Sequence, residues 1–334
     1  MQEDNNKQRI LITGGMGFIG SHVVEHIHRH TKWDIVILDK LSYASKGFER
    51  IRSMGLMNSS RLSTFTFDFS QPITEGLALE MGDVNYIVHM AADTHVDNSI
   101  NTPVPFILNN VMSTVELLEY ARGLKNLHRF FYFSTDECLG PAVDGVRFKE
   151  WDVHNPTNPY SASKSASESI CLAYENTYNV PVLITNTVNV YGERQLVEKF
   201  IPKVIQYVLE GKEIQIHSYP GCERAGNRFY IHARSVADAV LFLIKNGETG
   251  EKYNVCSDDQ MDNLELALFI ADVVGKPLKY KMVDWHTSER AGHDVSYNLC
   301  GEKMKGMGWR PPIPFRESLK KTVQWTLENQ EWLE

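Results

Sequence analysis

The strongest constraint on the fold is the alternation of short β-rich runs with helical segments along the first half of the chain. Helices are predicted at Phe18–His30, Val104–Arg122 and Tyr160–Tyr178. The strands are predicted at Arg9–Thr13, Asp34–Leu38, Thr64–Phe67, Tyr86–His89, Arg129–Ser134 and Val182–Thr185. Several of these strands are apolar at consecutive positions, which is typical of strands that are covered on both faces. We therefore predict an α/β fold with a doubly wound parallel sheet.

The alternation weakens after about Tyr191, where loops rich in glycine and proline separate helices predicted near Val236–Lys245 and Asn263–Val274. A chain of 334 residues is long enough for two domains. We expect residues 1–187, with a return segment near 229–253, to form a nucleotide-binding domain. Residues 188–334 would form mainly a smaller C-terminal lobe that binds substrate at the carboxyl ends of the strands.

Composition and charge narrow the functional classes. The chain has 42 acidic and 34 basic residues and a net charge of −8, so we expect no nucleic-acid partner. Its five cysteines are scattered and form no CxxC pair, which favours a reducing compartment and predicts no metal site. The N-terminus is polar and no run reaches ~18 apolar residues, so we expect a cytoplasmic protein with no membrane segment.

A glycine-rich turn follows the first predicted strand, where Gly14, Gly17 and Gly20 match the pattern GxxGxxG. Residues without Cβ let the backbone approach a pyrophosphate at the N-terminus of the next helix. Asp39 ends the second strand, and a carboxylate there can bind both ribose hydroxyls and repel a 2′-phosphate. The pattern predicts NAD rather than NADP, although Lys40 weakens this preference, and the alternative is a purely structural turn.

Tyr160 and Lys164 are four residues apart, which places them on one face of a helix. A nearby ammonium lowers the pKa of a phenol, so Tyr160 could take a proton from a substrate hydroxyl. The spacing alone is weak support, because 14 tyrosines and 34 basic residues produce such pairs by chance. Tyr230 and Arg234 are also four residues apart, and we interpret them as such a chance pair.

An acidic pair stands at the end of the fifth predicted strand, in the sequence Ser134-Thr135-Asp136-Glu137. The carboxyl end of a strand is where this architecture presents side chains to a ligand. Thr135 could donate a hydrogen bond to a sugar hydroxyl, and two carboxyls in a desolvated cleft could act as one acid and one base. The alternative is a solvated turn.

These motifs occur in an order that is found in one enzyme family. The segments are TGGMGFIGSH, DKLSYA, HMAADTHVDNS, STDE, NPYSASKS, NVYG, EKFIPKVI, YNV and RAGHDVSY, and they span nearly the whole chain. In them the chain resembles the extended short-chain dehydrogenase/reductases, and among these the nucleotide-sugar 4,6-dehydratases. The resemblance implies a Rossmann-type NAD-binding domain, a smaller C-terminal substrate-binding lobe, and a lyase of deoxysugar biosynthesis, such as that of rhamnose.

The resemblance also implies the chemistry. The enzyme would oxidise C4 of a nucleotide-linked glucose with NAD, eliminate water across C5 and C6, and return the hydride to C6. Tyr160 would be the C4 base, Lys164 its partner, and Thr135 the residue that orients the C4 oxygen. Glu137 would remove the C5 proton and Asp136 would protonate the departing C6 hydroxyl. Related 4-epimerases oxidise C4 but need no such acid and base, so the acidic pair favours a dehydratase.

The residues expected to hold the two ligands follow from the same resemblance. The cofactor-binding residues would be Gly14, Gly17, Phe18, Ile19, Gly20, Asp39, Lys40, Ser42, Asp68, Phe69, Ala91, Ala92, Asn109, Tyr160 and Lys164. The substrate-binding residues would be Thr94, Asn189, Lys199, Phe200, Arg228, Asn254, Arg290 and His293. The chain departs from the family pattern at two motif positions: Leu139 replaces the usual Tyr and Glu193 the usual Pro.

Three questions stay open from the sequence. Asn98 stands where many dTDP-glucose enzymes carry Arg, which favours UDP-glucose as substrate over the alternative, dTDP-glucose. A UDP-sugar 4-epimerase and a non-catalytic NAD-binding scaffold are further alternatives, which the complete set of catalytic residues disfavours. The helices predicted at Val104–Arg122 and Tyr160–Tyr178 correspond to those that pair in dimers of the family, so we expect a homodimer.

Overall fold

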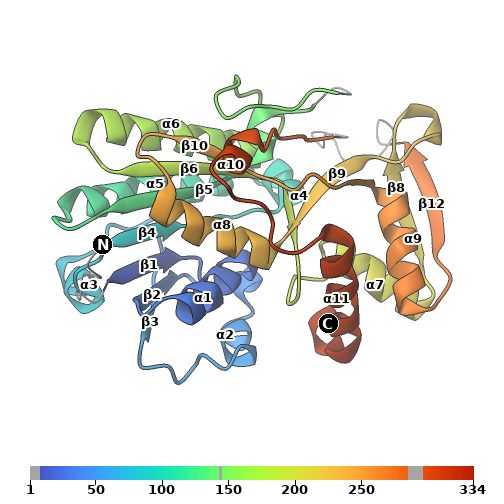
Figure 1. Ribbon diagram of the computed structural model, residues 1–334, viewed down its shortest axis with the longest axis horizontal. Helices are drawn as coiled ribbons and strands as arrows, with labels where there is room; N and C mark the ends of the chain where they lie inside the picture. Colours follow the sequence, from blue (N-terminus) through green and yellow to red (C-terminus); the bar gives the residue numbers. More distant parts are fainter. Residues whose placement is uncertain (1–7, 143–144, 285–295) are drawn as a thin grey trace. The chain divides into compact units, whose positions relative to one another are not determined.

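The computed structural model describes residues 8–142, 145–284 and 296–334, and its chain divides into two compact units (Figure 1). The first unit comprises the chain up to Thr135, Pro159–Asn186 and Ala237–Tyr253. The second unit comprises Asp136–Asn158, Thr187–Val236 and Asn254–Glu334. The chain therefore passes from one unit to the other several times.

A seven-stranded sheet forms the centre of the first unit, with the strand order β10-β6-β5-β4-β1-β2-β3 (Figure 1). Its strands are β1 (Arg9–Thr13), β2 (Asp34–Asp39), β3 (Leu62–Thr66), β4 (Tyr86–His89), β5 (Arg129–Thr135), β6 (Val182–Thr187) and β10 (Lys252–Val255). The last residues of β6 and β10, from Thr187 and from Asn254 onward, group with the second unit. β1 pairs in parallel with both β2 and β4, and β2–β3 and β4–β5 are parallel as well. The predicted doubly wound parallel sheet is confirmed.

The helices of the first unit cover strands whose apolar side chains point to both faces of the sheet. They are α1 (Phe18–His30), α2 (Glu49–Ser53), α3 (Glu75–Met81), α4 (Val96–Asn101), α5 (Pro103–Gly123), α6 (Pro159–Tyr178) and most of α8 (Ala233–Asn246), with the 3₁₀ turn η1 (Tyr43–Ser45). His26 Nε2 on α1 lies 3.8 Å from Asp238 Oδ2 on α8, which brings the two helices into contact. The Tyr174 hydroxyl donates to Glu119 at 2.6 Å and joins α6 to α5.

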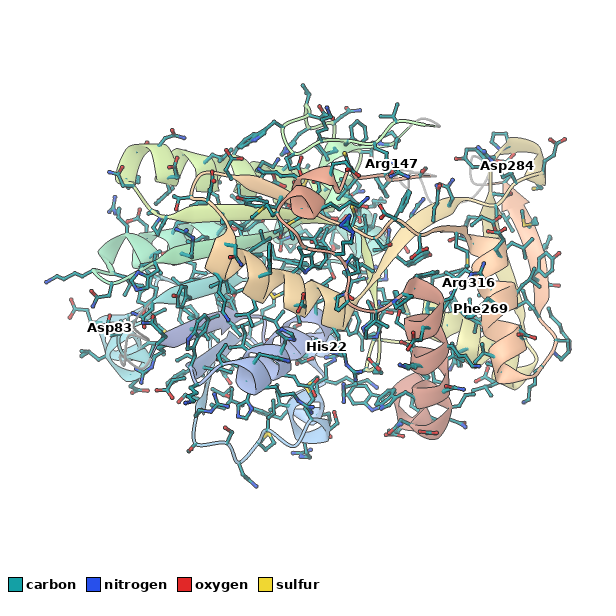
Figure 2. The ribbon with its side chains drawn as sticks, in the orientation of Figure 1. His22, Asp83, Arg147, Phe269, Asp284 and Arg316 are labelled. Atoms are coloured by element: carbon teal, nitrogen blue, oxygen red, sulfur yellow. The ribbon has the colours of Figure 1, made fainter. Side chains whose placement is uncertain are left out.

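The second unit contains two small sheets and its own apolar core. Its strands are β7 (Asn189–Tyr191), β9 (Asn227–His232) and β11 (Gln260–Asp262) in one sheet, and β8 (Glu213–Ser218) and β12 (Lys279–Asp284) in the other. The helices are α7 (Phe200–Glu210), α9 (Asn263–Val274), α10 (Glu302–Gly306) and α11 (Phe315–Glu328), with the 3₁₀ turns η2 (Asp136–Leu139), η3 (Pro220–Cys222) and η5 (Gln330–Leu333). Arg316 of α11 lies 5.5 Å from the Phe269 ring of α9 (Figure 2).

The segment between β5 and α6 groups with the second unit, whereas the sequence prediction placed all of residues 1–187 in one domain. The reason is its backbone pairing: the Phe148 N–H donates to the Asn298 carbonyl at 3.0 Å, and the Cys300 N–H donates to the Phe148 carbonyl at 2.8 Å. Arg147, labelled in Figure 2, also lies 5.6 Å from the ring of Phe229 in β9. These long-range partners are invisible in the local sequence pattern.

Within the described part of the chain, no helix combines the length and the apolar character needed to cross a membrane. The longest helix, α5, has 21 residues but is interrupted by polar side chains such as Asn109, Asn110 and Glu116.

The glycine turn before α1 generates a first prediction. A Cβ at Gly20 would lie 2.1 Å from the Gly14 carbonyl oxygen, which is backbone and cannot move aside cheaply. An alanine in a helix normally stabilises by ~0.5–1 kcal/mol relative to glycine, but we expect Gly20→Ala to lower the free energy of unfolding by about 1–3 kcal/mol. Urea denaturation of both variants measures the difference. Gly123→Ala, whose Cβ meets nothing within 4 Å at the end of α5, is the control and should not destabilise.

Candidate active site

The turn between β1 and α1 is tight, and its inner side has no room for side chains, so glycines stand there. Gly14 has φ +69°, and a Cβ there would lie 2.9 Å from the Ala91 backbone. The Gly14 N–H donates to the Leu38 carbonyl at 2.9 Å, which anchors the turn to β2. Gly17 is the N-cap of α1 and has an extended backbone conformation. Because it is a glycine, it has no side chain to cap the helix. The first N–H groups of α1, at Phe18 and Ile19, therefore lack intrahelical acceptors.

Asp39 ends β2 and is held beside this turn. Its Oδ2 accepts from the Met16 N–H at 3.0 Å, and its Oδ1 accepts from the Leu41 N–H at 2.8 Å. Burial raises the pKa of Asp39, and the two amide donors and the nearby charge of Arg50 partly offset this effect. Each carboxylate oxygen has a further lone pair for a ligand hydroxyl.

Lys40 and Asn109, both predicted to bind the cofactor, lie together in the structure. The Lys40 ammonium donates to Asn109 Oδ1 at 3.1 Å and to Asp93 at 3.3 Å. Asp93 was not predicted, and it partly neutralises Lys40. The charge that weakened the expected preference for NAD over NADP therefore has a carboxylate partner.

A buried polar chain fixes the ends of β1 and β4. The Thr13 hydroxyl is 2.8 Å from His89 Nδ1, and it accepts from the N–H groups of Met90 and Ala91. His89 Nε2 is 3.2 Å from the Thr114 hydroxyl on α5. Burial lowers the pKa of His89 to about 3, so the imidazole is neutral at physiological pH. The chain holds Ala91, a predicted cofactor residue, against the glycine turn.

The other predicted cofactor residues lie at the same edge of the first unit or close to it. Phe18 begins α1 and packs edge-on against His22, with ring centroids 5.6 Å apart (Figure 2). Ser42 precedes η1, and Ala92 is half-buried after β4. Asp68 is exposed after β3, where the Ser70 N–H lowers its pKa, whereas the neighbouring Phe69 is buried.

These features fit NAD. The helix N-terminus with free N–H groups and no Cβ at Gly17 suits a pyrophosphate, because backbone donors and the helix dipole both favour an anion there. The Asp39 carboxylate suits the hydroxyls of an unphosphorylated ribose. The backbone N–H groups of Phe18 and Ile19 would hold the pyrophosphate, and Asp39 would hold the ribose. For the other predicted cofactor residues, binding remains a proposal.

Thr135, Tyr160 and Lys164 are all buried in the first unit. Thr135 is the last residue of β5, and the other two lie one turn apart on α6. The Lys164 ammonium donates to the Phe133 carbonyl of β5 at 2.6 Å and lies 4.2 Å from the centre of the Tyr132 ring. These contacts hold the Tyr160 face of α6 next to the carboxyl end of β5.

Asp136 and Glu137 continue the chain directly from Thr135 and form the first turn of η2. Asp136 is buried, which argues against a solvated turn, and Glu137 is half-buried. Glu137 Oε2 accepts from Asn158 Nδ2 at 3.4 Å. Leu139, where the family carries Tyr, is buried in the same turn.

The predicted substrate-binding residues are distributed over both units. Thr94 is exposed between β4 and α4 in the first unit, whereas Asn189 of β7 pairs with Tyr230 of β9 in the second. In β9, Arg228 lies 5.0 Å from the Tyr297 ring. The N-terminus of α7 carries the other two, Lys199 as its N-cap and Phe200 as its first residue.

Asn254 has a structural role in the second unit. Its buried amide donates to the carbonyls of Phe148 at 2.9 Å and Cys300 at 3.2 Å, which leaves the Nδ2 group no further hydrogen for a ligand. The predicted substrate residues Arg290 and His293 lie outside the described residues.

Sequence reasoning missed a buried cluster next to Thr135. It consists of Glu168 on α6, Lys252 on β10 and Asn186 on β6. One signal was available, because Glu168 follows Lys164 by four residues and therefore lies on the same face of the helix. The partners on β6 and β10 could not be found from the local sequence.

Comparisons with known proteins agree with this geometry. The model of the NAD dependent epimerase/dehydratase family matches residues 10–256. Over 349 residues the chain is 34% identical to a dTDP-glucose 4,6-dehydratase of Escherichia coli, with 98% of this chain and 94% of the relative covered. It is 33% identical over 329 residues to a trifunctional UDP-glucose 4,6-dehydratase/UDP-4-keto-6-deoxy-D-glucose 3,5-epimerase/UDP-4-keto-L-rhamnose-reductase of Arabidopsis thaliana, covering 97% of this chain and 48% of that protein.

A solved structure is similar over the same length. The dTDP-glucose 4,6-dehydratase of Streptomyces venezuelae, crystallised with NAD, superposes with a TM-score of 0.87 at 32% identity, covering 98% of this chain and 99% of the other. The matching fold, the glycine turn and the full-length similarity lead to one conclusion. The chain belongs to the NAD dependent epimerase/dehydratase family and uses NAD as its cofactor.

Proposed function

We propose that this enzyme dehydrates a nucleoside diphosphate glucose to its 4-keto-6-deoxy derivative. The observation that carries the proposal is the unbroken run of Thr135, Asp136 and Glu137 at the carboxyl end of β5, with Tyr160 and Lys164 on the adjacent helix α6. The relatives from Escherichia coli and Streptomyces venezuelae, both named as dTDP-glucose 4,6-dehydratases, support the same reaction.

The first unit would carry the chemistry at C4. When bound, NAD would supply reversible hydride chemistry, being reduced as C4 is oxidised and reoxidised as C6 is reduced. The Tyr160 phenolate would accept the proton of the C4 hydroxyl, and the positive charge of Lys164 would stabilise that phenolate. Thr135, buried at the end of β5, would hold the C4 oxygen by a hydrogen bond. The hydrogen bond from Lys164 to the Phe133 carbonyl holds Tyr160 and Lys164 of α6 beside the end of β5.

The acidic pair would carry the elimination. A ketone at C4 acidifies the C5 proton, which the Glu137 carboxylate would remove. The C5 electron pair would then form the C5–C6 double bond while the C6–O bond breaks, and Asp136 would protonate the departing hydroxyl so that it leaves as water. One group gives a proton and the other takes one, so the pair ends the step with its charges exchanged. The proton held by Glu137 would return to C5 when the hydride is added at C6.

The acidic pair also separates the dehydratase from the alternatives. A 4-epimerase needs only the chemistry at C4, so it has no use for a second acid and base at C5 and C6. A non-catalytic scaffold would need neither Tyr160 nor the pair. All five residues are present, and only a dehydratase has a use for every one of them.

We take UDP-glucose as the preferred substrate and dTDP-glucose as the alternative. Asn98, which carries the UDP preference, is exposed on α4, four residues after Thr94. The named relatives do not discriminate between the two nucleotides. The relative at 34% identity is named as a dTDP-glucose enzyme, and the Arabidopsis relative at 33% is named as a UDP-glucose enzyme. Arg228 and Lys199 of the second unit would offset the charge of the diphosphate.

The acid–base assignment predicts different defects for two variants. Glu137→Gln keeps the shape of the side chain but cannot accept the C5 proton. We expect it to oxidise C4 and accumulate the 4-keto-glucose nucleotide, with kcat for full dehydration at least about 100-fold lower. Tyr160→Phe, the matched comparison, should block C4 oxidation itself. Quenched-flow mass spectrometry of the bound sugars distinguishes the two, and full turnover by Glu137→Gln would reject its role as the base.

The nucleotide preference predicts which sugar is consumed faster. The single methyl group that distinguishes thymine from uracil is worth ~1–3 kcal/mol of discrimination, or about 10–200-fold. We expect kcat/KM for UDP-glucose to exceed that for dTDP-glucose within this range, measured by mass spectrometry as loss of one water from each substrate. The reverse order would establish dTDP-glucose as the substrate. Conversion of neither would contradict the proposed function.

We also propose that two copies of this chain pair through α5. Val104, Ile107, Leu108 and Met112 are exposed apolar side chains at helical spacing, so they form one stripe. α5 and α6 are already held together by Tyr174 and Glu119, so the stripe extends a rigid helix pair. A second copy of the same stripe would bury it in a self-complementary, two-fold contact.

A charge within the stripe should therefore separate the copies. Val104 and Leu108 are 63% and 57% exposed in the chain, so Val104→Glu/Leu108→Glu should leave the fold intact and produce a monomer. Light scattering at micromolar concentration measures the mass. Leu79→Glu, where the side chain is 82% exposed on a different helix, α3, is the control. A monomeric wild-type protein would contradict the proposal.

A further inference from the structure

A buried polar network joins three neighbouring strands to α6 in the first unit. The Lys252 ammonium is 2.7 Å from Glu168 Oε2, and the two side chains are only 3% and 1% exposed. Glu168 Oε1 accepts from Asn186 Nδ2 at 2.7 Å, and the same Nδ2 donates to the Thr135 carbonyl at 3.1 Å. The network therefore runs from an ion pair on β10 and α6, through β6, to the last residue of β5.

Its chemistry requires an amide at Asn186. Glu168 Oε1 and the Thr135 carbonyl oxygen can only accept, so the group between them must donate twice. The Nδ2 group has two hydrogens and uses one for each acceptor. An aspartate would bring a third acceptor, and an apolar side chain would remove this donor from both buried acceptors.

The network lies where the chain leaves the first unit. Thr135 and Asn186 are each the last residue of a first-unit segment, and Lys252 is one residue before the end of another. The Thr135 carbonyl belongs to the peptide group that links Thr135 to Asp136. The hydrogen bond from Asn186 therefore fixes the plane of the peptide from which the acidic pair Asp136-Glu137 departs.

We propose that Asn186 is a positioning residue, which acts through the Thr135 carbonyl to orient Asp136 and Glu137 for the elimination. Glu168 orients the Asn186 amide, and Lys252 neutralises Glu168, so that a carboxylate can be buried beside β5. Asn186 itself touches neither substrate nor cofactor in this scheme. The inference rests on the proposed dehydratase function for its catalytic consequence, but its structural part can be measured without any substrate.

A purely stabilising ion pair would use the same residues, so the variants must separate the two roles. Glu168→Gln/Lys252→Met removes both charges but keeps an oxygen that can accept from Asn186. Asn186→Ala removes the donor and keeps both charges. Asn186→Leu, which also lacks the donor but keeps the same number and branching of side-chain heavy atoms, replaces Asn186→Ala if the smaller side chain prevents folding.

The first measurement is hydrogen–deuterium exchange by mass spectrometry on the full chain with its bound NAD. We expect Asn186→Ala to speed amide exchange in residues 134–140 and leave the β1–α1 turn unchanged, and we expect the charge-free double variant to behave like the wild type. Equal effects of the two variants on residues 134–140, or no effect of Asn186→Ala there, would overturn the positioning role.

The second measurement is steady-state dehydration of the better nucleotide glucose. Misplacement of a catalytic group by about 1 Å can cost about 100-fold in rate, so we expect Asn186→Ala to lower kcat by roughly that factor with KM nearly unchanged. The double variant should keep kcat within about threefold of the wild type, because the amide contact remains. A proportional loss of kcat in both variants would indicate stability alone. An inactive wild type would contradict the proposed function, and the exchange data would still decide the role of Asn186.

Discussion

Parallel strand pairing is the constraint on which the rest of this structure depends. Because β1 pairs in parallel with β2 and β4, and β4 with β5, their carboxyl ends meet at one edge of the sheet. Thr13, Asp39, His89 and Thr135 are the last residues of these four strands. The glycine turn, Asp39 and Thr135 thus share one edge of the sheet without any long loop, so the sheet itself brings the proposed cofactor-binding and catalytic residues together.

Buried polar groups at this edge are expensive, and each is compensated in a different way. For Asp39, two backbone amides and the Arg50 charge partly offset the desolvation of the carboxylate. His89 avoids the cost by remaining neutral, with hydroxyl partners on both ring nitrogens. Glu168 is paired with the Lys252 ammonium at 2.7 Å. Such groups add little net stability, but they restrict the site to one arrangement, because any other would leave a charge or an acceptor unpaired.

Most of the first unit was predictable from the sequence, because its signals are local. The bounds of β1, α1 and β4 agree with the predicted segments, and Gly14, Gly17 and Asp39 lie where the motif requires them. Asn186 and Lys252 were not predictable in the same way, because nothing in the residues around them indicates that a carboxylate from α6 lies between them. The second unit was harder still, since residues 136–158 join it through the backbone of Phe148 and its partners near Cys300.

The sequence by itself determined the strand–helix alternation, the glycine turn, and the identity and order of Thr135, Asp136, Glu137, Tyr160 and Lys164. These depend on backbone conformational preference and on residue chemistry within a few positions, which are properties of short segments. Only the tertiary structure decided which buried charges face each other and which amide holds the Thr135 carbonyl, because those contacts join residues dozens of positions apart. The free energy of burying a charge depends on its partners in space, and no local pattern records them.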